Sequence, residues 1–429
     1  MGRVWAWAVT LPVLLWAGCG GEAQTTVRVE LVPSAPPAAE LFDGGLDGEG
    51  FPDGGFEAEG DGGTVTAPED PPPIELPPPS EPIFQPGFFQ NLRASRRTEG
   101  RVTLRYTVPV LRSGGRLKVV LLAGNSSLTV HEATVARAGS GGSLSGTAKQ
   151  LKFSGQPTAH VPSRQRLASD PLSFEVDAPA DLVVSLDVDG GVGASLIDAF
   201  PNSFLAPAGQ AWHTHVTGAQ PHHRLWGLNA ILVEGPAEPV FLAIGDSITE
   251  GYVSGHDDVR DAWPHLAAEG SLVPVANGAV SGQGVYSANE LFGDELQWLS
   301  EFKVTHCLVM LGTNDLAALD AAEMKARIGG FFDRLRPLCE VWAGTLIPRE
   351  KAEGADLAEV HARRADVNAW LRAGAGGRAA HVVDFEAVTC AEGDPNRFRQ
   401  GFSWDGIHPT LAGQRAMGEL AAQELARVK

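Results

Sequence analysis

Basic residues and cysteine are both scarce in this chain. Its 429 residues contain 33 Lys and Arg against 52 Asp and Glu, a formal net charge of −19, and only 4 cysteines. This balance argues against nucleic acid as a partner, because nucleic-acid binding requires basic patches, and against electrostatic docking on anionic lipid. No Gly-rich phosphate loop of standard spacing occurs and no cysteine has metal-ligand spacing. We therefore expect neither a metal nor an organic cofactor.

Three of the cysteines, Cys307, Cys339 and Cys390, lie in the C-terminal half. Because their number is odd, they do not make a complete disulfide framework. Cys307 lies in an apolar run, and we expect it to be a small core residue. The alternative is a bridge between Cys307 and Cys339, which requires that the strands near them be neighbours.

The apolar run at residues 4–16 is too short for a comfortable membrane span. It follows a single positive charge and precedes small residues, which is typical of a secretory signal. Ala17-Gly18-Cys19 resembles the bacterial lipobox, although Trp16 stands where that pattern prefers Leu. We predict a lipoprotein signal peptide over residues 1–18 and lipidation of Cys19, which places the exported protein on the bacterial outer membrane. The alternative is ordinary cleavage near Ala17 and secretion.

Residues 19–83 are almost without basic side chains. No Lys or Arg occurs between Arg28 and Arg93, whereas Gly, Pro, Asp and Glu dominate. Such a segment cannot bury enough apolar surface to order itself, and its Pro runs stiffen it locally. We predict an acidic, disordered tether that lifts the folded part off the bilayer if Cys19 is anchored.

Residues 84–236 carry short apolar runs with frequent alternation and β-branching, separated by turn residues. The runs cover residues 102–108, 117–122, 128–130, 182–188 and 231–233. This pattern predicts an all-β sandwich domain of jelly-roll type. Two roles remain open for it: a module that binds glycan or shapes the substrate, and a structural partner that covers one flank of the next domain.

From residue 237 to 429, strands alternate with helices, as a doubly wound α/β sheet requires. The first expected strand ends at Gly245, and the others cover residues 273–276, 304–311, 341–347 and 381–385. The expected helix starts are Ser287, Asp320, Asp356 and Thr410. Within the helix that follows Asp356, Leu357, Val360, Val367 and Leu371 share one face and predict its buried side.

The first of these strands delivers a serine to the edge of the sheet. The apolar run Phe241 to Gly245 ends in Asp246-Ser247, and helix-compatible residues follow. A serine at this place lies where open α/β sheets bind ligands, close to helix N–H groups that favour negative charge. The turn alone is weak support for catalysis, since Asp and Ser are also common helix N-caps.

Three further blocks follow: Asn277 to Gly282, Gly312 to Asp315, and Asp405 to Pro409. Together with Gly245-Asp246-Ser247 they resemble, in order and spacing, the four blocks of the SGNH, or GDSL-type, ester hydrolase superfamily. The resemblance covers about the C-terminal half and implies a flavodoxin-like, three-layer hydrolase domain with a parallel five-stranded sheet. A strand-rich module before this domain is loosely similar to the two-domain carbohydrate esterases of the superfamily.

Ester hydrolysis requires a nucleophile, a base and a group that orients the base. Ser247 is the candidate nucleophile, His408 the base and Asp405 its orienter. The separation of three residues places Asp405 and His408 on one turn, where the carboxylate meets one ring nitrogen and the other faces Ser247. The alternative for this pair is helix capping by a polar turn.

The tetrahedral oxyanion also needs hydrogen-bond donors. In the manner of the superfamily, these are the N–H of Ser247, the N–H of Gly282 and the side-chain amide of Asn314. Gly278 is the alternative to Gly282. We expect Asp246 and Asp315 to bind turn N–H groups rather than to act as acids or bases.

We therefore expect a secreted serine esterase that hydrolyses small acyl esters, with acetyl groups on polysaccharide as the first candidate substrate. The expected contact with the membrane is the lipid anchor at Cys19. The alternative enzyme is a lipase or lysophospholipase, which needs a large apolar channel or lid, and no long apolar insertion lies near the blocks. The alternative outside enzymes is a catalytically silent, glycan-binding surface lipoprotein. The presence of Ser247, Gly282, Asn314, Asp405 and His408 argues against it.

Overall fold

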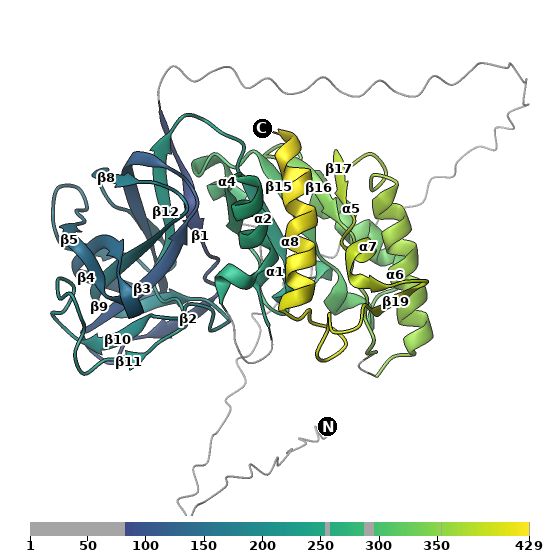
Figure 1. Ribbon diagram of the computed structural model, residues 1–429, viewed down its shortest axis with the longest axis horizontal. Coiled ribbons are helices and arrows are strands. Elements are labelled where there is room, and N and C mark those ends of the chain that lie inside the picture. Colours follow the sequence, from purple (N-terminus) through teal and green to yellow (C-terminus); the bar gives the residue numbers. More distant parts are fainter. Residues whose placement is uncertain (1–81, 254–257, 287–295, 353, 429) are drawn as a thin grey trace, which may run out of the picture. The chain divides into compact units, whose positions relative to one another are not determined.

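The computed structural model describes residues 82–253, 258–286, 296–352 and 354–428 (Figure 1). The predicted signal peptide, Cys19, the tether and the helix start at Ser287 lie outside the described residues. Within those ranges, no helix combines the length and the apolar character that a membrane crossing requires.

Residues 83–235 form a sheet-rich region, called the β-region below. Its antiparallel strands pair in the order β1-β12-β4-β9-β3-β10-β11. These strands are β1 (Ile83–Phe89), β3 (Val102–Val110), β4 (Gly114–Ala138), β9 (Ala180–Ala194), β10 (Phe204–Pro207), β11 (Gln220–Pro221) and β12 (Leu228–Gly235). Five shorter strands pair with β9 or β4: β2 (Ala94–Arg97), β5 (Leu144–Gln150), β6 (Ala159–Val161), β7 (Arg166–Ala168) and β8 (Leu172–Val176).

Strand β4 takes part in both halves of this region and so encloses its core. The two apolar runs expected at 117–122 and 128–130 are parts of this one strand of 25 residues. Its first part pairs with β12 and its second part with β9. Alternate residues such as Leu117, Val119 and Leu121 are fully buried and join one core with residues of the second part. The prediction of a sheet-rich region is confirmed, and the jelly-roll arrangement stays a prediction.

The C-terminal part, residues 241–428, is called the α/β region below. Five parallel strands form its sheet in the order β14-β13-β15-β16-β17. They are β13 (Phe241–Gly245), β14 (Val275–Asn277), β15 (His306–Met310), β16 (Glu340–Gly344) and β17 (His381–Val383). The parallel five-stranded sheet is therefore confirmed, and its order is that of flavodoxin-like folds. Each strand except the first is shorter than, or offset from, the run expected from the sequence.

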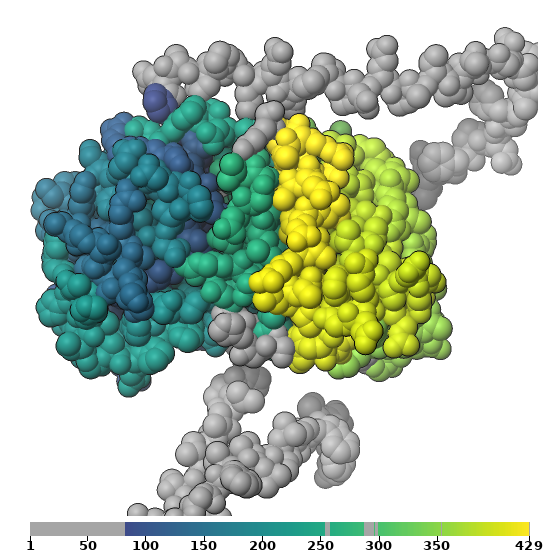
Figure 2. Space-filling view, viewed as in Figure 1, coloured from purple at the N-terminus to yellow at the C-terminus, as the bar shows by residue number. Residues whose placement is uncertain are grey.

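Helices cover this sheet on both faces. The chain moves one way from β13 to β14 and the opposite way from β15 to β17, and right-handed crossovers then place the connecting helices on opposite faces. α2 (Trp263–Ser271) packs against α8 (Leu411–Leu425), and the two lie side by side at the surface in Figure 2. α5 (Ala321–Leu335) packs against α6 (Leu357–Arg372). Within the described residues, the other α-helices are short: α1 (Ser247–Glu250), α4 (Gln297–Glu301) and α7 (Phe385–Thr389).

The expected helix starts within the described residues are confirmed. The side chains of Asp320, Asp356 and Thr410 each accept a hydrogen bond from an N–H of the first turn that follows. The expected buried face of α6 is partly wrong, because Leu357 at its first turn is 37% exposed. Arg364 occupies that face instead and is fully buried.

The preference for an unbridged Cys307 is also wrong. Cys307 and Cys339 form a disulfide with Cα atoms 5.9 Å apart. Cys307 lies in β15 and Cys339 directly precedes β16, and these neighbouring strands bring the two residues together. Cys390 carries a free thiol.

The β-region and the α/β region share part of their hydrophobic core. Phe89, Val120 and Leu232 pack into the cluster that also contains the strands of the parallel sheet. Phe89 meets Phe302 edge-on with ring centroids 5.7 Å apart. Both regions accordingly fall within one compact unit of the chain.

Candidate active site

Ser247 is the first residue of α1, directly after β13. Asp246 caps this helix, and its side chain accepts the N–H of Ile248 at 2.9 Å. Gly245 permits the sharp turn, because a Cβ there would lie 2.1 Å from the hydroxyl oxygen of Thr249. Within the described residues, the N–H of Ser247 at the helix start donates to no backbone acceptor, so it can bind an anion.

The structure brings Ser247, His408 and Asp405 together. Ser247 Oγ lies 2.9 Å from His408 Nε2, across 161 residues of sequence. His408 Nδ1 lies 2.8 Å from Asp405 Oδ2. An ionised carboxylate can only accept a hydrogen bond, so the Nδ1 atom that faces Asp405 must carry the proton of a neutral His408 ring. Nε2 is then unprotonated and can accept the hydroxyl proton of Ser247.

Asp405 is held in its ionised form. Burial alone would raise the pKa of this carboxyl, but hydrogen bonds from the His408 ring and from the N–H groups of His408 and Ile407 outweigh it and lower the pKa. Its Oδ1 accepts those two N–H groups at 2.7 and 2.8 Å. One carboxylate thus fixes both the ring and the backbone of the residue that carries it.

The candidate oxyanion donors come from two loops. Gly282 is exposed, has φ +78, and would meet nothing within 4 Å if it carried a Cβ. Within the described residues, its N–H has no hydrogen-bond partner. Gly278 instead donates its N–H to Ala243 O at 2.9 Å and packs against Leu242. Of the two glycines weighed from the sequence, only Gly282 can offer its N–H to a substrate.

The side-chain amide of Asn314 binds the neighbouring loop with one of its two protons. Its Nδ2 donates to Gln283 O at 2.8 Å. An amide nitrogen carries two protons, so one remains for a ligand. Arg349, fully buried, donates from Nη1 to Thr313 O at 2.7 Å and so holds the segment in which Asn314 lies.

Three further carboxylates near the site accept hydrogen bonds from backbone N–H groups of its loops. Asp315 accepts the N–H of Val285 at 2.7 Å, and burial raises its pKa. Burial likewise raises the pKa of Asp246 to about 7 and that of Glu250 to about 7. As the sequence suggested, Asp246 and Asp315 bind turn N–H groups. Glu250 was not singled out, because in sequence it is an ordinary acid in a short helix.

Two aromatic rings flank the His408 imidazole. Tyr252 meets it edge-on with centroids 4.8 Å apart, and Trp404 lies nearly parallel to it at 6.1 Å. Trp404 is 45% exposed, an unusual state for a tryptophan. In the sequence, only its position next to Asp405 could have indicated that Trp404 lies at the site.

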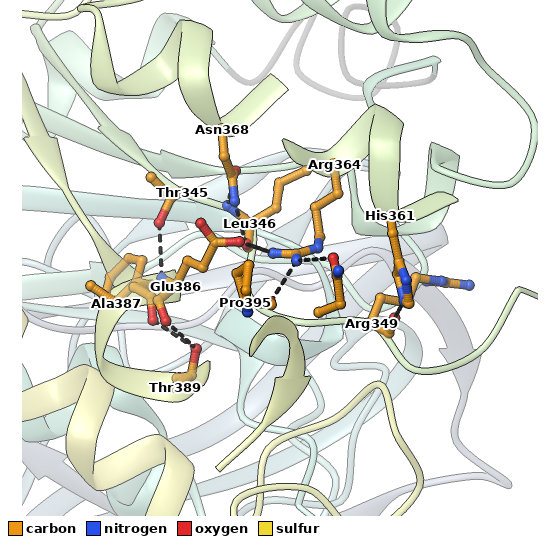
Figure 3. Close-up of polar contacts among 12 residues, drawn as sticks. Thr345, Leu346, Arg349, His361, Arg364, Asn368, Glu386, Ala387, Thr389 and Pro395 are labelled. Carbon is orange, nitrogen blue, oxygen red and sulfur yellow. Dashed lines mark hydrogen bonds and ion pairs between the residues drawn. The ribbon is translucent and has the colours of Figure 1, made fainter. Parts of the chain in front are cut away.

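A buried ion network lies behind the site and is structural (Figure 3). Arg364 points between Glu386, with which it pairs, and the carbonyl oxygens of Leu346 and Pro395. It thereby fastens α6 to α7 and to the loop after β16. Across the described ranges, no group of three His, Cys, Asp or Glu side chains is placed to hold a metal ion.

One protein-family model matches the part of the chain that contains this site. Residues 243–416 match the sequence model of the GDSL-like Lipase/Acylhydrolase family. No curated protein matches the chain. Solved structures similar to it include a member of the lipolytic protein G-D-S-L family from Veillonella parvula, with 21% identity over 43% of this chain and 97% of that one, at a TM-score of 0.36. Another is the carbohydrate acetylesterase Est24 from Sinorhizobium meliloti, with 13% identity over 45% of this chain and 100% of that one, at a TM-score of 0.37. A third is an aryl esterase from M. smegmatis, with 15% identity over 45% of this chain and 100% of that one, at a TM-score of 0.37.

Proposed function

We propose that the chain, a carboxylic ester hydrolase whose residues 243–416 match the GDSL-like Lipase/Acylhydrolase family, cleaves small acyl esters with Ser247, His408 and Asp405 as its triad. The observation that carries the proposal is the continuous hydrogen-bonded chain from Ser247 Oγ through His408 to Asp405, at 2.9 and 2.8 Å.

In this mechanism Ser247 Oγ attacks the acyl carbonyl while His408 Nε2 takes its proton. Asp405 stabilises the imidazolium, and the N–H groups of Ser247 and Gly282 with the Asn314 amide bind the oxyanion. His408 returns the proton to the leaving alcohol as the C–O bond breaks, which leaves an acyl group on Ser247. Water, deprotonated by His408, then hydrolyses this acyl-enzyme and regenerates the serine.

We propose that the alcohol carrying the acyl group is a sugar, and that the acyl group is acetyl. The support is Trp404, whose exposed ring lies beside the base, where the leaving alcohol must be. An exposed aromatic face packs against the C–H groups on one face of a sugar ring and leaves the sugar hydroxyl groups in water. Replacing Trp404 with Ala is expected to raise KM for acetylated xylan about 10-fold, while KM for ethyl acetate, whose alcohol has no ring, changes little. An equal effect on both substrates would remove this support.

We also propose export and lipid anchoring at Cys19 on the bacterial outer membrane, with residues 20–83 as tether. The support is the signal-like run that precedes Cys19. In cells, Cys19→Ser is expected to shift the protein from the membrane fraction to the soluble fraction. Unchanged membrane fractionation would exclude the anchor.

The function itself is tested by release of nitrophenol from acetyl and octanoyl esters by the purified protein without residues 1–18. We expect acetyl turnover that Ser247→Ala abolishes. Preference for octanoate would favour a lipase, and the absence of serine-dependent turnover on these esters and on acetylated xylan would favour the silent glycan-binding protein.

A further inference from the structure

The donor loop of the candidate site is held by residues of the β-region. This loop, residues 277–282, is called the Gly282 loop below. Its backbone begins at the sheet, where Val280 N donates to Gly245 O at 3.0 Å, and ends at the exposed Gly282. Ser281, the last residue before Gly282, has its own anchor, and that anchor is Glu250.

Glu250 binds Ser281 twice with one oxygen. Its Oε2 accepts the Ser281 N–H at 2.7 Å and the Ser281 hydroxyl at 2.6 Å. The residue is only 1% exposed. A carboxylate that is closed off from solvent and occupied by donors cannot reach a substrate, so Glu250 is not a catalytic acid or base. Charge-assisted hydrogen bonds of this kind are short and directional, and they fix the peptide plane that carries the N–H.

A further donor to Glu250 comes from the β-region: the side-chain amide of Gln90 lies 3.5 Å from Oε1. The backbone of Leu196 and Ile197 also lowers the pKa of this carboxyl, against the effect of its burial. These residues lie 53 or more positions before Glu250 in sequence. The carboxylate is therefore a junction whose one side is the β-region and whose other side is the Gly282 loop.

A second set of contacts reaches the same loop directly. Asn91 donates its backbone N–H to Asn277 O and its side-chain Nδ2 to Gly278 O, both at 3.2 Å. Gln90 forms an isolated parallel bridge with Asn277. Asn91 of the β-region thus binds the start of the loop. Glu250 binds its end, and Glu250 itself contacts Gln90 of the β-region.

We propose that Glu250 is a positioning residue that fixes the Gly282 N–H for the oxyanion, and that the β-region is for this reason a part of the catalytic apparatus. The inference rests on the proposed function. The Ser281 N–H and the Gly282 N–H belong to successive peptide planes, so movement of the first reorients the second. The Asn314 and Asp315 contacts hold only the far side, at Gln283 and Val285.

The first experiment compares Glu250→Gln with Glu386→Gln in kcat and KM for nitrophenyl acetate. Both variants neutralise a buried carboxylate, but only Glu250 touches the Gly282 loop. We expect Glu250→Gln to lower kcat about 10- to 100-fold with KM within about 2-fold, as for a misplaced transition-state donor. Glu386→Gln should lose thermal stability and keep its kcat at a temperature where it is folded. Wild-type kcat in Glu250→Gln, or equal losses in both variants, would overturn the proposal.

The second experiment tests the β-region side with Asn91→Ala and Gln210→Ala. Gln210 is a buried amide whose bonds, to Pro207 and Thr217, stay within the β-region. We expect Asn91→Ala to lower kcat several-fold and Gln210→Ala to leave it unchanged. If the two variants behave alike, the β-region has no specific role in catalysis.

Hydrogen exchange separates this inference from the proposed function. Amides of peptide 275–286 should lose protection in Glu250→Gln and Asn91→Ala and keep it in Glu386→Gln and Gln210→Ala. If the wild-type protein shows no Ser247-dependent turnover, the proposed function fails, and the exchange data still decide whether the β-region anchors the loop. Unchanged protection in Glu250→Gln would overturn the anchoring whatever the activity.

Discussion

Two groups of buried carboxylates in the α/β region are stabilised in different ways. At the candidate site, Asp246, Glu250 and Asp315 accept hydrogen bonds from backbone N–H groups, and within the described residues none of them forms an ion pair. Behind the site, Glu386 pairs with Arg364 and Arg372. The first group has raised pKa values because of burial.

The difference follows from what each group has to hold. An arginine between two elements fixes their distance, as Arg364 does for α6 and α7 (Figure 3). A carboxylate that takes the N–H groups of a loop fixes the orientation of peptide planes, which a candidate oxyanion hole requires. The cost of the second arrangement is an uncompensated charge, and it makes the site more sensitive to pH than the network behind it.

Substitution of Asp405 is expected to change activity most, because this site carboxylate contacts His408, the candidate base. Asp405→Asn keeps the shape of the residue but offers His408 Nδ1 an amide that can donate, which favours the wrong tautomer. We expect kcat for nitrophenyl acetate to fall by about 10⁴ with thermal stability nearly unchanged. A decrease below about 10-fold would show that His408 does not depend on Asp405, and would count against the triad.

Glu386→Gln is expected to give the largest loss of stability. It leaves Arg364 buried without its charged partner, and removal of one partner of a buried pair costs about 3–5 kcal/mol. Urea unfolding of the variant, followed by fluorescence, measures this cost. A loss below 1 kcal/mol would mean that the network contributes little, and that the two groups of carboxylates do not differ as described.

The same contrast explains what the sequence could predict. Local spacing was sufficient for the Asp405–His408 turn and for the helix caps at Asp320, Asp356 and Thr410. Alternation of strands and helices was sufficient for the parallel sheet, although buried runs continue into loops and blur the strand ends. Ser247 lies 161 residues from His408, so only the order of the four blocks pointed to their meeting.

Features that depend on exact tertiary contacts were not predictable. Glu250 obtains its donors from residues that are distant in sequence, and no local pattern marks such a site. The Cys307–Cys339 bridge requires a particular register of two neighbouring strands, which composition does not give. Leu357 was expected to be buried, but it lies at the open end of α6, and Arg364 takes the inner face because Glu386 lies opposite.

Asp246→Asn tests the pH sensitivity of the site. With a pKa raised to about 7, Asp246 keeps its proton in the folded state over a range in which the unfolded chain has lost it. The unfolding free energy therefore falls as pH rises from about 4 to about 7, with a slope of up to about 1.4 kcal/mol per pH unit for this group. The variant should lose that slope. Urea titrations at several pH values measure it, and an unchanged slope would contradict the raised pKa.

Asp384 shares its partner Arg372 with Glu386 and so belongs to the network behind the site. Asp384→Asn gives the smallest expected effect and the opposite pH dependence. Burial alone would raise the pKa of Asp384, but hydrogen bonds from Arg372 and Thr345 outweigh it and lower the pKa. Its stabilising contribution is therefore present above the unfolded pKa, near 4, and is lost as pH falls further. Because both partners are about a third or more exposed, we expect the variant to lose less than about 1 kcal/mol at pH 7 and nothing near pH 2. If stability instead falls more at acid pH, Asp384 belongs with the site carboxylates, and the division between the two groups fails.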